Sequence, residues 1–170
     1  RPCLLVFERG LSIPIPDLRR LPGLLFPVLG DYCLLDFLLA SIAPLDPRTI
    51  VVLGEGSRDL LPAAVERWGA FGVETVVIGP DAEAVAELVE SIDSEEILVA
   101  STTFAALFEP ARLLSELRIP RRDRLSKIAV DGTPLDFYAT RKKSLLAVVR
   151  GPAAAGYDQE PCIDQLFDRG

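Results

Sequence analysis

The chain has 170 residues, of which 49% are hydrophobic and 25% are charged, and a formal net charge of −7. This balance is typical of a single globular domain with a substantial core and argues against an intrinsically disordered chain. The acidic surface disfavours nucleic acid and anionic membranes as partners, and no apolar run approaches the roughly 20 residues that span a bilayer. We therefore expect a cytoplasmic protein that binds neither nucleic acid nor a membrane.

The sequence contains no histidine and three widely spaced cysteines, Cys3, Cys33 and Cys162. The lack of histidine excludes Ser-His-Asp and Cys-His nucleophile schemes and every His-ligated metal site. No C-x-x-C pair occurs, so the sequence indicates neither a zinc site nor a disulfide framework. We expect no metal site, and we expect Cys33 to be a buried, inert thiol.

Short β-branched runs alternate with longer helical stretches along the first hundred residues. Strands are expected over residues 3–7, 49–53, 74–78 and 97–100, and helices over 32–43, 57–68, 82–92 and around 111–117. Asp31, Ser57 and Asp81 are the expected helix N-caps. A long loop rich in Pro and Gly follows the first strand, and such loops are usually functional or mobile. This alternation predicts right-handed βαβ units and a parallel sheet.

The last part of the chain follows another pattern. Two apolar runs, 127–130 and 135–139, flank Asp131-Gly132 and predict a β-hairpin. Residues 144–149 and 160–169 are expected to be helical, with a small-residue loop over 151–156. The predicted fold class is α/β: a Rossmann-like mixed, mainly parallel sheet with helices on both faces.

In an open parallel sheet, ligands bind outside the carboxyl ends of the strands, so we looked for a site in the residues that follow each strand. No catalytic residue can be assigned. The candidate ligand-binding edge consists of residues that follow the strands, together with Asp36 of the first expected helix and Arg20 of the long loop. Its members are Glu8, Arg9, Gly10, Arg20, Asp36, Gly54, Gly56, Ser101, Thr102 and Thr103.

For the Gly54–Gly56 turn and for the hydroxyls of residues 101–103, we favour a purely structural interpretation. Gly54-Glu55-Gly56 resembles the opening of the phosphate-binding G-x-G-x-x-G pattern, but Asp59 stands at its third position, so a tight turn capped by Ser57 is the better interpretation. The hydroxyls of residues 101–103 could bind a phosphate or satisfy the amides of the next helix. Asp31 and Asp36 lack a convincing spacing for a metal-binding pair.

The basic stretch from Arg118 to Lys127 is unusual in an acidic protein. Arginine forks suit phosphate groups, so this stretch could attract an anion, but a solvated loop or a contact with a protein partner is the favoured interpretation. No aromatic residues are interleaved with it, which counts against single-stranded nucleic acid.

Residues 27–42, PVLGDYCLLDFLLASI, resemble the segment P-x-G-G-x-Y-R-L-I-D-F-x-L-S-N of the bacterial glucose-1-phosphate adenylyltransferases (ADP-glucose pyrophosphorylases). Four further stretches resemble segments of that family in the same order: TIVVLGEGSRDLL, EEILVASTTFAALFEPARLLSEL, PLDFYATRKKSLLAVV and CIDQLFDRG. The resemblance covers most of the chain and implies one nucleotidyltransferase-like domain over residues 1–170. The family's β-helix domain is missing, which fits a fragment of a longer chain.

Two motifs that carry the chemistry of that family differ in this chain. The family's first strand leads into the Gly-rich signature L-A-G-G-x-G-T-R-L, which cradles the nucleotide triphosphate, whereas here the stretch is FERGLSIPIPDL. The family's S-G-D supplies an Asp to Mg²⁺, and here it reads Ser101-Thr102-Thr103. Magnesium takes oxygen ligands that normally include carboxylate, so both cradle and metal site are degenerate.

Two functions follow from the resemblance, and a third from the glycines. The first is a degenerate domain, a pseudoenzyme, that acts as a regulatory or assembly module through an exposed apolar interface with a second copy or a catalytic subunit. The second is an active enzyme that makes a nucleotide-sugar from an NTP and a sugar 1-phosphate with Mg²⁺, with Glu8, Asp36 or another carboxylate replacing the missing Asp. The third is a generic binder of a nucleotide or sugar phosphate at Gly54 and Gly56. The missing signature favours the first.

Overall fold

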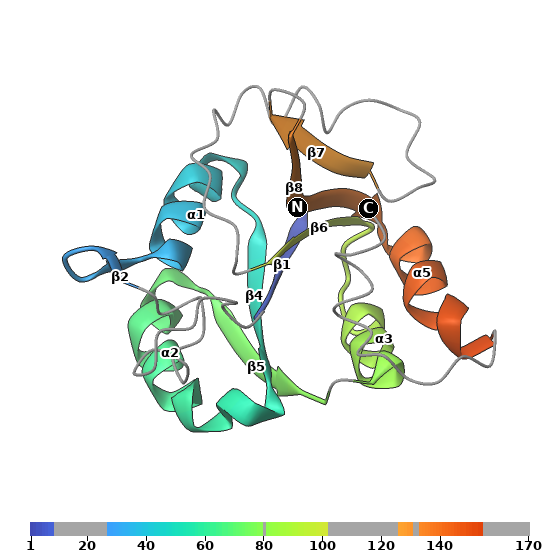
Figure 1. Ribbon diagram of the computed structural model, residues 1–170, viewed down its shortest axis with the longest axis horizontal. Coiled ribbons are helices and arrows are strands. Elements are labelled where there is room, and N and C mark those ends of the chain that lie inside the picture. Colours follow the sequence, from blue (N-terminus) through green and yellow to red (C-terminus); the bar gives the residue numbers. More distant parts are fainter. Residues whose placement is uncertain (9–26, 80, 102–125, 131–132, 155–170) are drawn as a thin grey trace.

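The computed structural model describes residues 1–8, 27–79, 81–101, 126–130 and 133–154. Six strands form the main sheet: β1 (Cys3–Phe7), β4 (Arg48–Gly54), β5 (Glu74–Ile78), β6 (Glu96–Ser101), β7 (Ser126–Val130) and β8 (Thr133–Arg141). Their order is β5-β4-β1-β6-β8-β7, and helices lie on both faces of the sheet (Figure 1). β5, β4, β1 and β6 are parallel, whereas β8 runs antiparallel to β6 and to β7. The predicted fold class is confirmed.

The central strands are uninterrupted apolar runs because helices cover both of their faces. All five residues of β1 are fully buried, and in β4 the five residues between the two ends are buried as well. The predicted bounds of β1 and β5 are confirmed, and β4 and β6 are each longer than predicted by one residue at both ends. β7 and β8 confirm the predicted hairpin.

One face of the sheet carries α1 (Leu34–Ile42) and α2 (Leu61–Trp68), on the left of Figure 1. Short 3-10 segments flank these helices: η3 (Ala43–Leu45), η4 (Glu55–Leu60) and η5 (Gly69–Phe71). Leu35, Leu38 and Ile42 of α1 and Trp68 of α2 join the inward side chains of the strands in one core cluster. A separate two-stranded hairpin, β2 (Pro27–Leu29) and β3 (Tyr32–Cys33), precedes α1.

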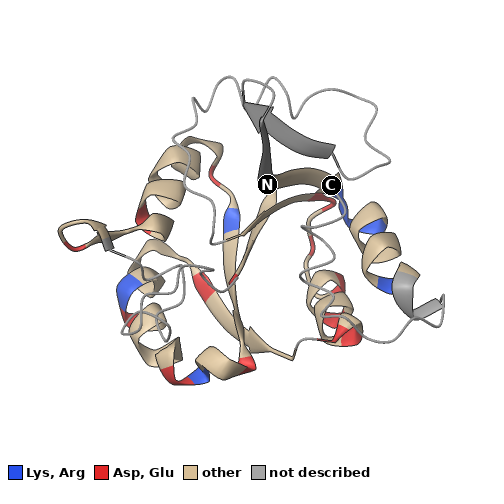
Figure 2. Ribbon diagram, viewed as in Figure 1, with Lys and Arg blue, Asp and Glu red and all other residues tan. Residues whose placement is uncertain are grey.

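The other face carries α3 (Ala82–Glu90) and α5 (Lys142–Ala154), which pack against each other. Val85 and Val89 of α3 and Leu145 and Val149 of α5 are fully buried in the second core cluster. Figure 2 shows several acidic residues along α3. Glu83, Glu87 and Glu90 of this helix are exposed, and Arg150 of α5 pairs with Glu83 and Glu90. Among the described helices, none combines the length and apolarity needed to cross a membrane.

Of the three predicted helix caps, only Asp81 is confirmed: its carboxylate accepts a hydrogen bond of 2.8 Å from the backbone N–H of Ala84. Asp31 does not cap α1, whose N-cap is Cys33, because residues 32 and 33 belong to β3. Ser57 lies inside η4, and α2 begins four residues later, so the prediction of a helix cap there was wrong.

The end of α5 corrects a second prediction. Residues 151–154 continue the helix, whereas the small residues there predicted a loop. The predicted helices over 111–117 and 160–169 lie outside the described residues.

Candidate functional site

The chain changes direction across the sheet at β1. The connections from β1 lead to β4 and then β5 on one side, and β6 lies on the other side of β1. In doubly wound sheets the crevice outside the carboxyl ends of the strands at such a switch point is where ligands bind. Here the two ends are level, because Phe7 of β1 is paired in register with Ser101 of β6. Glu8, the residue directly after β1, therefore stands at the switch point.

The carboxylate of Glu8 is bound within the fold. Its Oε2 accepts a hydrogen bond of 2.9 Å from the backbone N–H of Gly54, and its Oε1 accepts one from the hydroxyl of Ser57. The backbone N–H of Glu8 donates to the carbonyl of Val52, at 2.9 Å. Charge-assisted hydrogen bonds of this kind are about twice as strong as neutral ones. Glu8 thus joins the carboxyl ends of β1 and β4 and fixes the turn into η4.

The remaining candidates divide into three groups. Gly56 is exposed in η4, and its Cβ position faces open space. Ser101 is fully buried at the end of β6. The predictions for Arg9, Gly10, Arg20, Thr102 and Thr103, and for the basic stretch 118–125, lie outside the described residues.

The described part of the switch point does not fit a magnesium ion. Among the described residues, no three or more His, Cys, Asp or Glu side chains are placed so that they could hold a metal ion together. Both oxygens of Glu8 already accept hydrogen bonds from Gly54 and Ser57. A Mg²⁺ ion demands near-octahedral oxygen ligation, usually with one or two carboxylates beside the phosphates.

Asp36 lies in a different cluster from Glu8. It is the third residue of α1, and its Oδ2 accepts a hydrogen bond of 2.8 Å from the backbone N–H of Cys33, the N-cap residue. Its Oδ1 accepts a hydrogen bond of 2.9 Å from the indole Nε1–H of Trp68, and Arg67 forms an ion pair with the Asp36 carboxylate. Arg67 also donates to the backbone carbonyl of Asp31. Asp36 therefore ties the start of α1 to the last turn of α2, a role that no local pattern could reveal.

Electrostatics of this cluster follow from its contacts. Partial burial opposes ionisation of Asp36, but the hydrogen bonds from Arg67, the Cys33 backbone and Trp68 hold the pKa of its carboxyl well below the usual range. Burial, with the hydrogen bond to Asp36, raises the pKa of the Cys33 thiol. Burial also raises the pKa of the Cys3 thiol to about 11. Raised pKa values disfavour the reactive thiolate, which fits the prediction that Cys33 is inert.

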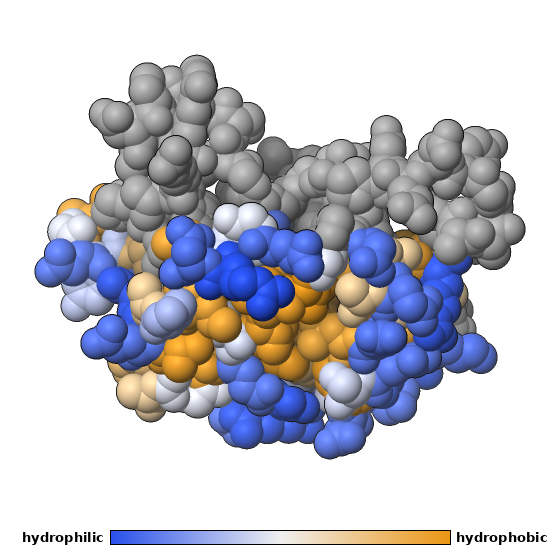
Figure 3. Space-filling view, turned by 90° about the horizontal axis from the view of Figure 1, so that it is seen from below, coloured by the Kyte–Doolittle hydropathy of each residue, from blue (hydrophilic) through white to orange (hydrophobic). Residues whose placement is uncertain are grey.

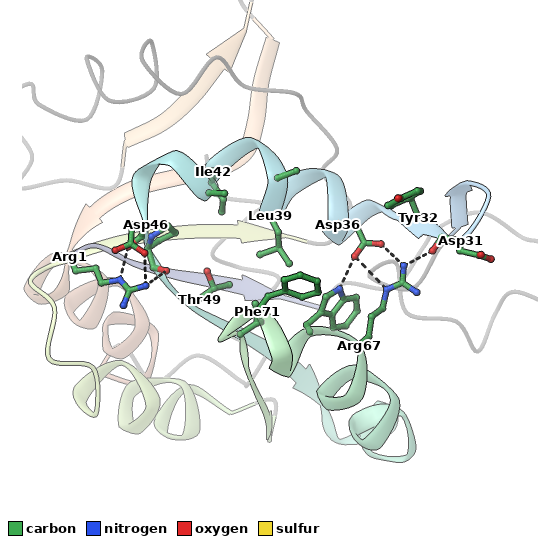
Figure 4. A pocket seen from close by; sticks show the side chains of 15 residues that line it. Arg1, Asp31, Tyr32, Asp36, Leu39, Ile42, Asp46, Thr49, Arg67 and Phe71 are labelled. Atoms are coloured by element: carbon green, nitrogen blue, oxygen red, sulfur yellow. Dashed lines mark hydrogen bonds and ion pairs between the residues drawn. The ribbon is translucent and has the colours of Figure 1, made fainter.

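A groove of about 730 Å³ runs between α1 and the end of α2 (Figure 4). Leu39 and Ile42 of α1 line one side, and Phe71 and Val73 line the other. Each end carries an ion pair: Arg1 with Asp46 at one end, and Arg67 with Asp36 at the other. Its volume lies in the range of small-molecule pockets, although its walls are mainly apolar side chains on a helical surface.

The groove lies away from the strand ends that form the switch point. Arg1, Asp46 and Thr49 precede or begin strands β1 and β4, so they stand at the amino ends of those strands. Figure 3 views the molecule from below, and across the middle of that face it shows apolar residues bordered by hydrophilic ones. β5 is the edge strand of the sheet, and Val76, Val77 and Ile78 in it are only half-buried. Apolar surface is therefore exposed at more than one place.

Comparison with solved structures identifies the fold. A protein from Bacillus anthracis assigned as a glucose-1-phosphate thymidylyltransferase superposes with a TM-score of 0.69 at 12% identity, covering 100% of this chain and 84% of that chain. The fold is that of nucleotidyltransferases. A nucleotidyl transferase from Methanothermobacter thermautotroptrophicus gives a TM-score of 0.64 at 18% identity, covering 99% and 83% of the two chains.

A third nucleotidyltransferase, the inositol-1-phosphate CTP transferase from T. maritima, gives a TM-score of 0.62 at 15% identity, covering 100% of this chain and 82% of that chain. No family model matches the sequence, and no curated protein does. The fold is therefore shared with nucleotidyltransferases. The closer resemblance to the glucose-1-phosphate adenylyltransferases stays a prediction.

Proposed function

We propose that this chain is a degenerate nucleotidyltransferase-like domain that acts as a regulatory or assembly module. The observation that carries the proposal is the bonding of Glu8, the described carboxylate at the switch point. Both of its oxygens accept hydrogen bonds from the β4–η4 turn, from Gly54 and Ser57. These two hydrogen bonds fix the position of the carboxylate against the turn. In this chain the same group holds two strand ends together, which is a structural task.

Two further observations support the proposal. The similarity to nucleotidyltransferases extends over the whole chain, so the scaffold is present even though the sequence lacks the Gly-rich signature and the metal-binding Asp. The groove beside α1 supports the assembly role, because Phe71 on its wall is 79% exposed. Large exposed apolar surfaces on soluble domains commonly mark interfaces.

The proposal is tested by measuring binding and turnover on one sample of the full chain. Calorimetric titration with ATP, CTP, GTP and UTP in the presence of Mg²⁺ reports binding, and release of pyrophosphate in the presence of glucose 1-phosphate reports turnover. We expect no pyrophosphate with any nucleotide. Binding near micromolar affinity without turnover would support the regulatory role, and four flat titrations would support the assembly role.

Turnover would contradict the proposal. Pyrophosphate release that requires both an NTP and a sugar 1-phosphate would establish instead the active alternative, a nucleotidyltransferase that makes a nucleotide-sugar. The Glu8→Gln variant then serves as the matched control, because it keeps the size of the side chain and removes its charge. If the active enzyme uses the Glu8 carboxylate, the Glu8→Gln variant would lose turnover. If catalysis does not involve Glu8, the variant would keep its turnover.

A further inference from the structure

The groove between α1 and α2 has one polar side chain on its floor. Thr49 of β4 lines the groove and is only 5% exposed, and Figure 4 shows it below Leu39 and Ile42 of α1. Its hydroxyl makes no hydrogen bond to any residue that the structure describes. Nearly every buried polar group in a protein has a hydrogen-bond partner, so we expect a water molecule or a ligand to supply the partner of this hydroxyl.

A water molecule alone is a poor partner at this position. An ordered water needs about two to four polar neighbours. The middle of the groove is lined by apolar side chains, namely Leu39, Ile42, Phe71 and Val73. The charged side chains of the lining stand at the two ends of the groove (Figure 4). A molecule that has both an apolar body and a hydrogen-bonding group suits this combination better than water does.

The charges at the two ends of the groove favour an uncharged molecule. Arg1 is paired with Asp46 at 2.8 Å, and Arg67 is paired with Asp36. Asp31 also lines the groove, so the lining carries two positive and three negative charges. Among the described lining residues, no cation is left unpaired to attract an anion such as phosphate. A nucleotide or a sugar phosphate therefore fits this groove poorly.

The groove is preformed and has the size of a small-molecule site. Its volume of about 730 Å³ lies within the roughly 300–1,000 Å³ that is usual for such sites. Its two walls are fixed relative to each other, since Asp36 of α1 accepts hydrogen bonds from Arg67 and Trp68 of α2. Its floor consists of side chains that are at most 8% exposed, namely Ile42, Thr49, Trp68 and Val73. Because so little of these side chains is accessible, a small group reaches them more readily than a helix or strand of a partner protein does.

We propose that the groove binds a small, uncharged ring compound that carries a hydroxyl or carbonyl group. The ring lies between Leu39 of α1 and Phe71, whose side chain is 79% exposed and offers an aromatic face. The hydroxyl or carbonyl group of the compound pairs with the Thr49 hydroxyl. This site lies at the amino ends of β1 and β4, away from the switch point, so it goes beyond the proposed function and does not depend on it.

Equilibrium dialysis of the full chain against three related compounds tests the proposal. At neutral pH 2-naphthol is an uncharged aromatic alcohol, naphthalene lacks the hydroxyl, and 2-naphthoate carries a negative charge. We expect 2-naphthol to bind once per chain with a dissociation constant of about 0.1 mM, which is ordinary for a compound of this size. Binding of 2-naphthoate should be roughly 10-fold weaker, because the lining has an excess of carboxylates.

Substitution of Thr49 separates the hydrogen bond from the apolar contacts. Thr49→Val keeps the shape of the side chain and removes the hydroxyl, so it should weaken the binding of 2-naphthol roughly 3- to 10-fold and leave that of naphthalene unchanged. Thr140→Val is the matched control. Thr140 is also 5% exposed, but it lies in β8 on the face of the sheet that α3 and α5 cover, so its substitution should change neither affinity.

Phe71→Ala tests the apolar contact, and the variant should fold because this side chain is exposed. It should weaken the binding of both 2-naphthol and naphthalene, roughly 3- to 10-fold each. The proposal would be overturned if 2-naphthol showed no saturable binding up to about 1 mM. It would also be overturned if Thr49→Val left the affinity for 2-naphthol unchanged, or if 2-naphthoate bound as tightly as 2-naphthol.

Discussion

The two faces of the sheet are covered in different ways. α3 and α5 pack directly against each other, and Val85, Ala86, Leu145 and Val149 between them and the sheet are fully buried. α1 and α2 make few direct contacts, and a groove separates them instead. A polar bridge connects this second pair: Asp36 of α1 accepts hydrogen bonds from Arg67 and Trp68 of α2.

The difference shows what each face can do. Apolar contact between α3 and α5 buries the side chains between these two helices, whereas Val76 and Ile78 of the edge strand β5 stay half-buried beside the same cluster. Hydrogen bonds between α1 and α2 fix the two helices at a distance, because a charged pair needs a defined geometry and keeps contact with water. The α1–α2 face is therefore both rigid and open, which suits a binding surface.

The largest expected effect is on the open face, at Trp68. This side chain is 1% exposed, and it also donates to Asp36. Trp68→Ala removes the packing and one hydrogen bond and should lower the free energy of unfolding by about 3–5 kcal/mol, as measured by urea denaturation. Trp68→Phe keeps most of the packing and should cost about 1–2 kcal/mol. Equal losses in the two variants would mean that packing contributes little there.

Leu145 gives the corresponding test on the closed face. It is fully buried in α5, against α3 and the sheet. Leu145→Ala should lower the free energy of unfolding by about 2–5 kcal/mol, because a cavity forms between two packed helices. Leu146→Ala, at a half-buried neighbour, is the matched control and should cost less. An equal effect of the two variants in urea denaturation would contradict the burial of Leu145 between α5, α3 and the sheet.

Asp36 should make the open face sensitive to acid. The hydrogen bonds from Arg67, the Cys33 backbone and Trp68 outweigh partial burial and lower the pKa of its carboxyl in the folded state. A lowered pKa stabilises the fold fully above about pH 4, the range in which an unfolded Asp titrates, and this stabilisation is lost as the pH falls below that toward the folded value. Asp36→Asn should cost about 1–3 kcal/mol at pH 7.

The measurement compares urea midpoints at neutral pH and at about pH 3, below the usual range of Asp. Between neutral pH and about pH 3, the urea midpoint of the wild type should fall by more than that of Asp36→Asn. Asp93→Asn, at an exposed position, controls for the change in net charge. Identical pH dependence of the wild type and Asp36→Asn would contradict the role assigned to this carboxylate.

The smallest effect on folding is expected at Phe71. Because its side chain is 79% exposed on the groove wall, Phe71→Ala should change the free energy of unfolding of the monomer by less than about 0.5 kcal/mol. Urea denaturation at a concentration below that of association checks this value. A loss as large as that of Leu145→Ala would mean that Phe71 belongs to the core and that the groove is not an open surface.

Local sequence patterns were sufficient for much of the fold. β1 is a continuous apolar run, β5 is rich in β-branched residues and lies between Gly72 and Gly79, and Asp81 caps α3 with its own side chain. Each of these features follows from neighbours in the chain. The cap predicted at Ser57 failed because its hydroxyl instead donates to Glu8, 49 residues earlier. Tertiary partners of that kind leave no local signal.

The candidate site was predicted only in part, for the same reason. Glu8 and Gly54 were both expected at the carboxyl edge, and the structure joins them by a hydrogen bond. Asp36 was grouped with them because of its place in the chain, yet its partners are Arg67 and Trp68, about thirty residues later. The groove depends on the distance between α1 and α2. The hydrophobic pattern of the sequence does not predict this distance, because tertiary contacts set it.

The position of Trp68 has a practical consequence. It is the sole tryptophan of the chain, it lines the groove, and its indole N–H is bound to Asp36. Indole emission responds to the charge and hydration around the ring, so the intrinsic fluorescence of the protein reports on this one location. Filling the groove, or protonating Asp36, therefore changes an optical signal that needs no attached dye. The molecule carries its own probe at the surface where a partner is expected.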